Sequence, residues 1–319
     1  MNSIITKDNN RPLSNNKRNV AIDYAKGFAI MLIVLYHIYG YTGRAANSII
    51  YSFCHTVQLP LFFYISGMLL FRKSTQTINL YDKTIRLLVP FCVFYSIWII
   101  IHLNNLSHDE FKGGYWFLLV LFEMMFIIAI SLIISKRFNI DIRIVQIVIY
   151  LFLSIYEFSY PKNTAINIVL STNLLWHYFP FFIMGIYHNN IKLIYKLKYI
   201  IIYAIIFVFA LYLYYVNNYI KITPLCNLFS LLFFVTLFKS DIRPFERIIS
   251  LFGVYSMQIY LLHFWLVELI HNYIPLVNQR MIEFLIFLIL SIVLILLIIG
   301  ISNYLMKSKW CRLLLFGIK

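Results

Sequence analysis

The sequence predicts an all-α, polytopic integral membrane protein with about ten transmembrane helices and both termini in the cytoplasm. Of its 319 residues, 62% are hydrophobic and only 12% are charged, and the mean hydropathy is +0.81. This composition is far too apolar for a soluble domain. The apolar residues are gathered in long runs, and the connecting segments are alternately rich and poor in basic residues.

Ten apolar runs account for the expected helices. A helix needs roughly 17–25 residues to cross the hydrocarbon core of a bilayer, and most of the runs have that length. The fifth and the eighth runs are the shortest. In chain order the runs cover residues 20–39, 49–71, 85–103, 115–134, 142–158, 168–187, 199–216, 225–238, 248–270 and 281–305.

The basic residues predict the orientation of these helices. With a cytoplasmic N-terminus, the inside segments are 1–19, 72–86, 136–143, 192–198, 239–247 and 307–319, and they hold 21 of the 27 basic residues. This bias follows the positive-inside rule, and removing one internal helix would move every later segment to the other side. It also explains most of the net charge of +15, so no nucleic-acid partner is expected. The outside loops hold Arg44, Lys112, Lys162, Lys221 and Arg280.

Three segments are expected: a cytoplasmic N-terminal segment (1–19), a membrane domain (20–305) and a cytoplasmic C-terminal tail (306–319). The first segment lacks the apolar stretch of a cleavable signal, so the first helix is expected to be an uncleaved signal anchor. The four cysteines are widely separated and match neither a disulfide framework nor a zinc site, so no metal is expected.

The first helix carries Asp23, Lys26 and His37 within an apolar run. Ionisable groups at that depth cost a few kcal/mol unless they are paired, solvated or used. Lys26 and His37 are eleven residues apart, which places them about 20° apart around the helix and about 17 Å apart along it. One helix face therefore has a cation near one membrane surface and an imidazole near the other. An i,i+3 ion pair with Asp23 is a compatible role for Lys26.

Two further helices carry polar stripes. His55 and Ser66 are also eleven residues apart, with a proline between them. Ser256, Tyr260 and His263 follow at i, i+4 and i+7 and share one face. These residues are expected to line a polar site, and for the 256–263 stripe hydrogen bonding between helices is the simpler role. Two carboxylates, Glu123 and Glu268, also lie within apolar runs, and each must be protonated, paired or exposed to water.

Six ordered motifs include most of these positions. They are Asp23-x-x-Lys26-Gly27 followed by His37, Pro60-Leu61-Phe62-Phe63-Tyr64-Ile65-Ser66-Gly67, Lys83-x-x-Arg86-Leu87-Leu88-Val89-Pro90, Tyr115-Trp116-Phe117-Leu118, Phe181-Phe182-Ile183-Met184-Gly185, and Gly253-x-x-Ser256-x-x-Ile259-Tyr260-Leu261-Leu262-His263. In this order they resemble the integral-membrane acyltransferase-3 family, whose members acetylate extracytoplasmic sugars. Lys at positions 26 and 83, where the family commonly has Arg, is similar to the branch related to fucose O-acetylases.

The resemblance implies a membrane-bound O-acyltransferase that moves acetyl from cytoplasmic acetyl-CoA to a hydroxyl of an extracytoplasmic glycan or lipid-linked saccharide. Acetyl-CoA would be a substrate, with no tightly bound cofactor. Besides the lipid bilayer, the expected partners are this donor and the glycan acceptor. The Ile-, Asn-, Lys- and Tyr-rich composition is typical of AT-rich genes in bacterial surface-polysaccharide clusters, so the expected location is the bacterial cytoplasmic (inner) membrane.

The resemblance and the charges together predict roles for individual residues. Catalysis is expected from His37, Lys26 and Asp23, with His37 removing the proton of the acceptor hydroxyl, since imidazole has an ordinary pKa of about 6.5. The phosphates of acetyl-CoA are expected to bind to basic side chains of one cytoplasmic loop. These are Lys83 and Arg86, assisted by Arg72 and Lys73.

Simpler roles stay open for the same residues. His37 could be hydrogen-bonded to a neighbouring helix, and the paired basic residues could serve only as topology charges. A secondary transporter or glycan flippase also fits a polytopic chain with intramembrane charges, although no inverted repeat is evident and the outer loops are short. Covalent transfer of a labelled acetyl group distinguishes the enzyme from both.

Overall fold

Helices form all the regular structure that the computed structural model describes, which covers residues 19–45, 48–71, 78–102, 112–160, 164–217, 222–239 and 242–318. The long elements are α1 (Val20–Tyr41), α2 (Ile49–Leu70), α4 (Val89–Ile101), α5 (Trp116–Phe138), α6 (Ile142–Ser159), α8 (Thr172–Ile186), α9 (Ile200–Asn217), α10 (Thr223–Lys239), α12 (Ser256–Ile270) and α13 (Arg280–Leu305). The shorter ones are α3 (Leu80–Lys83), the π-helix η2 (Thr84–Leu88), η4 (Lys112–Gly114), α7 (Ala165–Leu170), η5 (Lys192–Tyr195), η6 (Leu197–Tyr199), α11 (Glu246–Val254), η8 (His271–Tyr273) and α14 (Lys309–Phe316).

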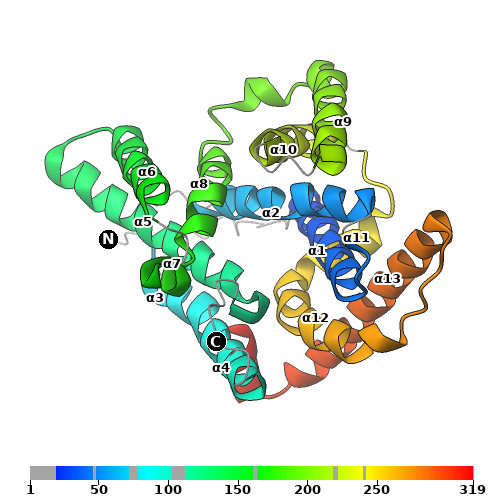
Figure 1. Ribbon diagram of the computed structural model, residues 1–319. Helices are drawn as coiled ribbons and strands as arrows, with labels where there is room; N and C mark the ends of the chain where they lie inside the picture. The colour runs from blue at the N-terminus through cyan, green and yellow to red at the C-terminus, as the bar shows by residue number, and fades with distance from the viewer. Residues whose placement is uncertain are drawn as a thin grey trace, which may run out of the picture.

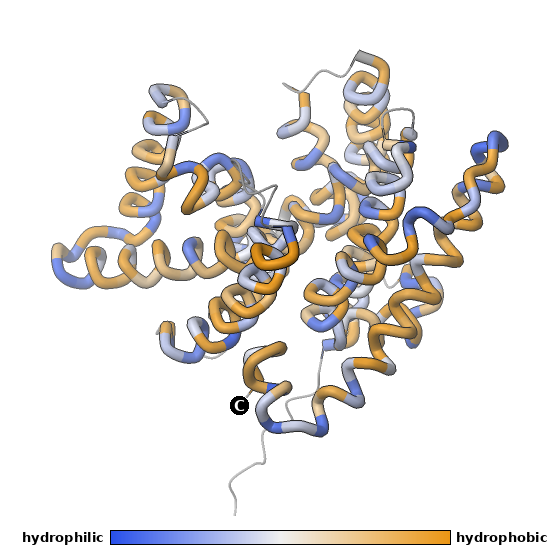
Figure 2. The backbone as a smooth tube through the Cα atoms, turned by 60° about the horizontal axis from the view of Figure 1, so that its bottom comes forward, coloured by the Kyte–Doolittle hydropathy of each residue, from blue (hydrophilic) through white to orange (hydrophobic). Residues whose placement is uncertain are grey.

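The helices are hydrophobic over most of their length, and hydrophilic residues gather at their ends and connections (Figure 2). Among the described residues, seven helices are long and apolar enough to cross a membrane, and the bent pair α11–α12 makes up to eight. The chain is therefore a multi-pass membrane protein. The expected count of ten is not reached by this measure, because the runs at 168–187 and 225–238 form helices of only 15 and 17 residues.

Helices α1 and α2 lie at the centre of the bundle (Figure 1). Helix α1 packs against α2, α11, α12 and α13, while α2 packs against α8, α9 and α10. Helices α5 and α6 form one side of the molecule and α12 and α13 another (Figure 1). The C-terminal tail contains α14, which returns to pack against α4.

Two glycines hold α1 against α11. A Cβ atom at Gly27 would lie 1.7 Å from the carbonyl oxygen of Ile249, and one at Gly253 would lie 1.8 Å from that of Asp23. These separations are far below van der Waals contact. The two motif glycines are therefore needed for backbone-to-backbone packing of the helices, as small residues are at other membrane helix interfaces.

A second glycine pair holds α2 against α8 in the same reciprocal way. A Cβ atom at Gly67 would lie 2.0 Å from the carbonyl oxygen of Phe182, and one at Gly185 would lie 1.9 Å from that of Tyr64. The glycines of the second and fifth motifs thus position α2, which carries Ser66, between α1 and α8.

The run at 248–270, expected to be one helix, is broken. Helix α11 ends at Val254, and α12 starts at Ser256 after a bend of 82°. Tyr255 lies between them with φ −97° and ψ 14°. Gly253 anchors α11 to the start of α1, while α12 packs along α1 and α13. A break at membrane depth is tolerated where the backbone is buried in protein or lines a cavity.

The third span contains the π-helix η2, which carries Arg86. The N–H of Val89 bonds to the carbonyl oxygen of Thr84, five residues back. Pro90 has no N–H to donate to the carbonyl of Arg86, so the regular α-helical ladder is interrupted there. Single turns of π-helix are frequent at functional sites.

Candidate functional site

A cavity of about 160 Å³ lies between α1, α2, the α3–η2 segment, α5 and α12. Six residues expected to form the site contribute to its wall, from five different elements. They are Lys26 from α1, Ser66 from α2, Lys83 and Arg86 from α3 and η2, and Ser256 and Tyr260 from α12. Five of the six sequence motifs, all but Phe181–Gly185, therefore contribute to one cavity, although their residues are separated by up to 234 positions.

The polar part of this cavity is positively charged. Lys26, Lys83 and Arg86 line it, and no acidic side chain belongs to its described lining. Helix α12 begins at Ser256 in the same wall, and a helix N-terminus carries a partial positive charge. Arg86 is exposed and Lys83 is half-buried. The arrangement suits an anionic ligand that enters from outside the bundle.

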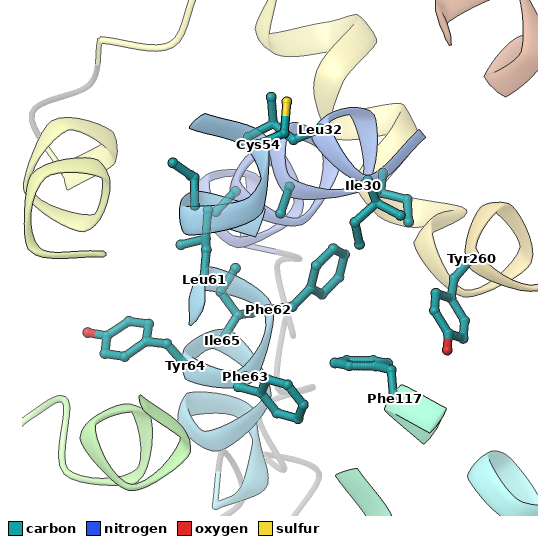
Figure 3. Close-up of a cluster of buried hydrophobic side chains, with 14 of the residues drawn as sticks. Ile30, Leu32, Cys54, Leu61, Phe62, Phe63, Tyr64, Ile65, Phe117 and Tyr260 are labelled. Atoms are coloured by element: carbon teal, nitrogen blue, oxygen red, sulfur yellow. The ribbon is translucent and has the colours of Figure 1, made fainter. Parts of the chain in front are cut away.

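The remaining wall is apolar. Phe62 of α2, Phe117 of α5 and Tyr260 of α12 point toward the same space between their helices (Figure 3). Aliphatic and methionine side chains complete the lining, namely Ile33, Leu69, Leu87, Leu118, Leu121, Met125 and Met257. The cavity therefore combines a cationic region with an apolar region, as a ligand with a charged end and a thin uncharged arm requires.

Tyr260 is fixed in this wall by a hydrogen bond. Its hydroxyl donates to the carbonyl oxygen of Gly114 at 2.7 Å. Gly113 and Gly114 have φ of +59° and +89°, a region that favours glycine, and a Cβ at Gly114 would lie 2.1 Å from the ring of Phe264. The Gly-Gly turn before α5 therefore brings a backbone acceptor to Tyr260.

His37 lies beside α12 and is not among the described residues that line the cavity. Its ring centroid is 5.1 Å from that of His263 and 4.4 Å from that of Phe264. The ring of Tyr260 is 6.0 Å from that of His263. Tyr260 and His263 thus connect the cavity wall to His37 through neighbouring rings.

The hydrogen bonds of His263 assign its tautomer. Its Nδ1 lies 3.0 Å from the carbonyl oxygen of Ile259 and 2.7 Å from that of Tyr260. Carbonyl oxygens only accept, so Nδ1 carries a hydrogen, and in the neutral ring Nε2 is an acceptor. His263 is fully buried, and its Nε2 has no hydrogen-bond partner among the described residues.

The other expected site residues occupy different places. Asp23 is buried at 7% exposure with its carbonyl against Gly253, and it is not among the described cavity-lining residues. An ion pair with Lys26 stays a prediction. His55 and Ser66 share a helix, but only Ser66 lines the cavity, whereas His55 lies against Tyr36 and Tyr214. Arg72 and Lys73 lie outside the described residues.

Sequence reasoning missed the partners of several charged groups. Lys112, interpreted as a loop charge, is 3% exposed, and its ammonium group donates to Ile168 O at 2.8 Å and to Ser171 Oγ at 2.6 Å. Glu268 lies 3.0 Å from His102 Nε2. A single sequence gives no signal for these pairs because each joins segments far apart in the chain.

Glu123 differs from Glu268. Both carboxylate oxygens of Glu123 are buried, and neither has a hydrogen-bond partner among the described residues. It lies on α5, whose residues Leu121 and Met125 line the cavity, but Glu123 itself is not in the described lining. We assign it no role in the site.

Comparison with known proteins gives one match. A sequence model of one protein family, described as an acyltransferase domain, matches residues 19–300. This range includes every residue of the described cavity lining. No curated protein and no solved structure matches the chain. The order of the motifs, the multi-pass helical fold and this match agree, and the chain belongs to the acyltransferase-3 family.

Proposed function

We propose that this membrane acyltransferase transfers acetyl from cytoplasmic acetyl-CoA to a hydroxyl of an extracytoplasmic cell-surface glycan or lipid-linked saccharide. The observation that carries the proposal is the cavity with cations at one part and aromatic rings at another, joined to His37 through Tyr260 and His263. Acetyl-CoA has the matching chemistry, because a phosphate-bearing nucleotide is joined to a thin, uncharged pantetheine arm.

The topology behind this proposal has ten crossings, with α8, α10 and the bent pair α11–α12 each crossing once. Both termini are then cytoplasmic, in agreement with the distribution of basic residues. Lys26, near the start of α1, and Lys83 and Arg86, near the start of the third span, belong to the cytoplasmic half. His37, toward the other end of α1, belongs to the extracytoplasmic half. The membrane would be the inner membrane of a bacterium.

Binding of the donor follows from the charges. Exposed Arg86 and half-buried Lys83 bind the phosphates, and Arg72 and Lys73 in the same loop add to the positive potential. Lys26 lies in the same cavity wall, where it holds a polar group of the donor. The pantetheine arm runs along the cavity wall formed by Phe62 and Phe117, whose rings pack edge to face, toward α12.

The chemical step is direct acyl transfer. His37 takes the proton of the acceptor hydroxyl while that oxygen forms a bond to the carbonyl carbon of the thioester. The carbon–sulfur bond breaks, and the CoA thiolate leaves and takes up a proton. His263, as an acceptor at Nε2, receives a hydrogen bond from one nitrogen of His37 and leaves the other nitrogen as the base. Asp23 positions Lys26 electrostatically.

The experiment is transfer of a radiolabel. Membranes with and without the protein are given acetyl-labelled CoA, and the glycan fraction is counted and examined by mass spectrometry for acetyl esters. We expect protein-dependent esters on a glycan or lipid-linked saccharide. Protein-dependent solute movement with no covalent label would instead indicate the transporter or flippase. Those alternatives are not favoured, because an acyltransferase family model matches residues 19–300.

A further inference from the structure

A second group of polar rings lies where α1, α2 and α9 meet. Tyr36 of α1 stacks on Tyr51 of α2 with centroids 4.3 Å apart, and its ring is 5.9 Å from that of His55. His55 stacks in turn on Tyr214 of α9 at 6.0 Å, with an angle of 9° between the rings. We call Tyr36, Tyr51, His55 and Tyr214 the tyrosine–histidine cluster. All four side chains are half-buried.

The cluster offers neutral hydrogen-bonding groups beside its ring faces. The hydroxyl of Tyr51 donates to that of Tyr36 at 2.7 Å, and the hydroxyl of Tyr214 lies 3.4 Å from Nδ1 of His55. A phenol hydroxyl can both donate and accept a hydrogen bond, and a neutral imidazole donates from one ring nitrogen and accepts at the other. These groups can therefore exchange their mutual hydrogen bonds for bonds to a ligand with several hydroxyls.

Two other helices fix the polar surroundings of His55. The side-chain amide of Asn227 on α10 lies 2.9 Å from Nε2 of His177 on α8. With the amide oxygen turned toward this imidazole, the amide nitrogen donates to the carbonyl of Thr56 at 3.2 Å, next to His55 in the chain. The cluster is thus supported by α8 and α10 as well as by the helices that carry it.

The cluster is directly beside the proposed base. Tyr36 precedes His37 in α1, and their rings are 5.1 Å apart and nearly perpendicular. A ligand that takes the place of Tyr51 at the hydroxyl of Tyr36 would therefore lie beside His37. The cationic cavity belongs to the other half of α1, where Lys26 is.

The charge of the ligand can also be inferred. The cluster contains no Asp, Glu, Lys or Arg side chain. Two basic residues of the predicted outer loops are already used, since Arg44 pairs with Glu283 at 3.0 Å and Lys112 donates to Ser171. An anionic sugar would lose its hydration beside these rings without gaining a cation from the four cluster side chains or from Arg44 and Lys112.

We propose that the tyrosine–histidine cluster is the acceptor subsite and that it takes an uncharged pyranose, such as a hexose, deoxyhexose or N-acetylhexosamine. The sugar's C–H face packs on the tyrosine rings, and its hydroxyls bond to the phenols and to His55. This inference rests on the proposed acetyl transfer to a glycan. It excludes uronic and sialic acids as the residue that is acetylated.

The first test identifies the acetylated sugar. Membranes containing the protein are given acetyl-labelled CoA, the glycan is cleaved under conditions that keep esters, and the labelled residue is identified by mass spectrometry. The expected label is on a neutral sugar. Label on a uronic acid, a sialic acid or a phosphorylated sugar would overturn the inference while leaving acetyl transfer intact. No protein-dependent label at all would instead remove the proposed function on which the inference depends.

The second test uses variants that keep each ring but remove its polar atoms. Tyr214→Phe and His55→Phe should each lower transfer at limiting acceptor by about five- to tenfold, the effect of one lost hydrogen bond. The KM for acetyl-CoA should not change. Tyr203→Phe is the matched control on α9, because its hydroxyl donates only to the backbone of Ile194 at 2.8 Å. Transfer by both cluster variants at the level of this control would overturn the subsite, and so would an equal rise in the KM for acetyl-CoA.

Discussion

The imidazole of His37 on α1 lies 5.1 Å, centroid to centroid, from the fully buried imidazole of His263 on α12. The backbone carbonyls of Ile259 and Tyr260 hold the hydrogen of His263 on Nδ1. A buried acceptor nitrogen without a partner costs free energy. A hydrogen bond from His37 during the reaction would relieve that cost and orient the base.

Replacing His263 tests this positioning role. His263→Leu removes the acceptor nitrogen at similar volume, and we expect kcat to fall at least tenfold with the KM for acetyl-CoA unchanged, since a base that is not oriented loses part of its roughly 10²–10⁴-fold contribution. His263→Gln keeps an acceptor oxygen and should retain more activity than His263→Leu. Equal losses in the two variants, with equal thermal stability, would contradict the positioning role.

His37 should be far more sensitive. His37→Ala is expected to lower the transfer rate by about 10²–10⁴-fold, because it removes the general base. Protein amount and membrane insertion should be unchanged, since an alanine is readily accommodated in a membrane helix. The rate is measured as acetyl label on glycan and normalised to protein in the membrane. Near-normal turnover would exclude His37 as the base.

The cations of the cavity should determine donor affinity. Lys83→Ala and Arg86→Ala should each raise the KM for acetyl-CoA by about tenfold, as expected for the loss of a charge-assisted hydrogen bond, and the effect should shrink as salt rises. Lys136→Ala changes an exposed cation at the end of α5, outside the described cavity lining, and serves as the control. If all three variants had the wild-type KM, the two cavity residues would be topology charges only.

Lys26 allows a test with three side chains at one position. Lys26→Arg should keep most of the activity, because either cation can hold a polar group of the donor in the cavity wall. Lys26→Ala should lose it, through the loss of that charge-assisted contact. Initial rates at limiting acetyl-CoA decide the point, because the loss of a contact with the donor is masked at saturation, and Lys26 has no part in the mechanism if the wild type and both variants are equally active.

The glycine contacts predict a stability effect that is separate from catalysis. Gly27→Ala places a Cβ where the Ile249 carbonyl oxygen lies 1.7 Å away, so we expect destabilisation by about 1–3 kcal/mol or more. Gly300→Ala is the matched control on a helix, with nothing within 4 Å of the added atom, and should be neutral or stabilising by up to about 1 kcal/mol. Thermal unfolding in detergent compares them. Equal melting temperatures of the two variants would mean that the close packing of α1 against α11 at Gly27 does not contribute to the free energy of unfolding.

Much of the fold could be predicted because a bilayer forces apolar runs to become helices. The break at Tyr255 could not be predicted, since neither Pro nor Gly stands at that position and the contact that holds α11, that of Gly253 with Asp23 of α1, joins segments far apart in the chain. The apolar run at 168–187 was expected to form one helix. In the structure it is divided at Ser171 between α7 and α8.

For the site, the sequence predicts which residues share a helix face but not which faces are in contact. Helical periodicity places Lys26 on a face and Ser256 with Tyr260 on another, but it does not say which faces meet. His55 and Ser66 illustrate the limit, because residues on one face but about 17 Å apart along a helix have different neighbours. The partners of His55 come from α1 and α9, which sequence spacing alone does not connect to it.

The most direct measurement is the sidedness of acetyl transfer. Everted membrane vesicles, with the glycan enclosed and the cytoplasmic face outward, are given acetyl-labelled CoA from outside. We expect labelled acetyl esters that an impermeant esterase removes only after the vesicles are opened, and we expect almost none when His37→Ala replaces the wild-type protein. Right-side-out vesicles given the same donor should stay unlabelled. Label in the right-side-out vesicles, or esters accessible on the outer surface of the everted ones, would contradict transfer from a cytoplasmic donor site to an extracytoplasmic acceptor.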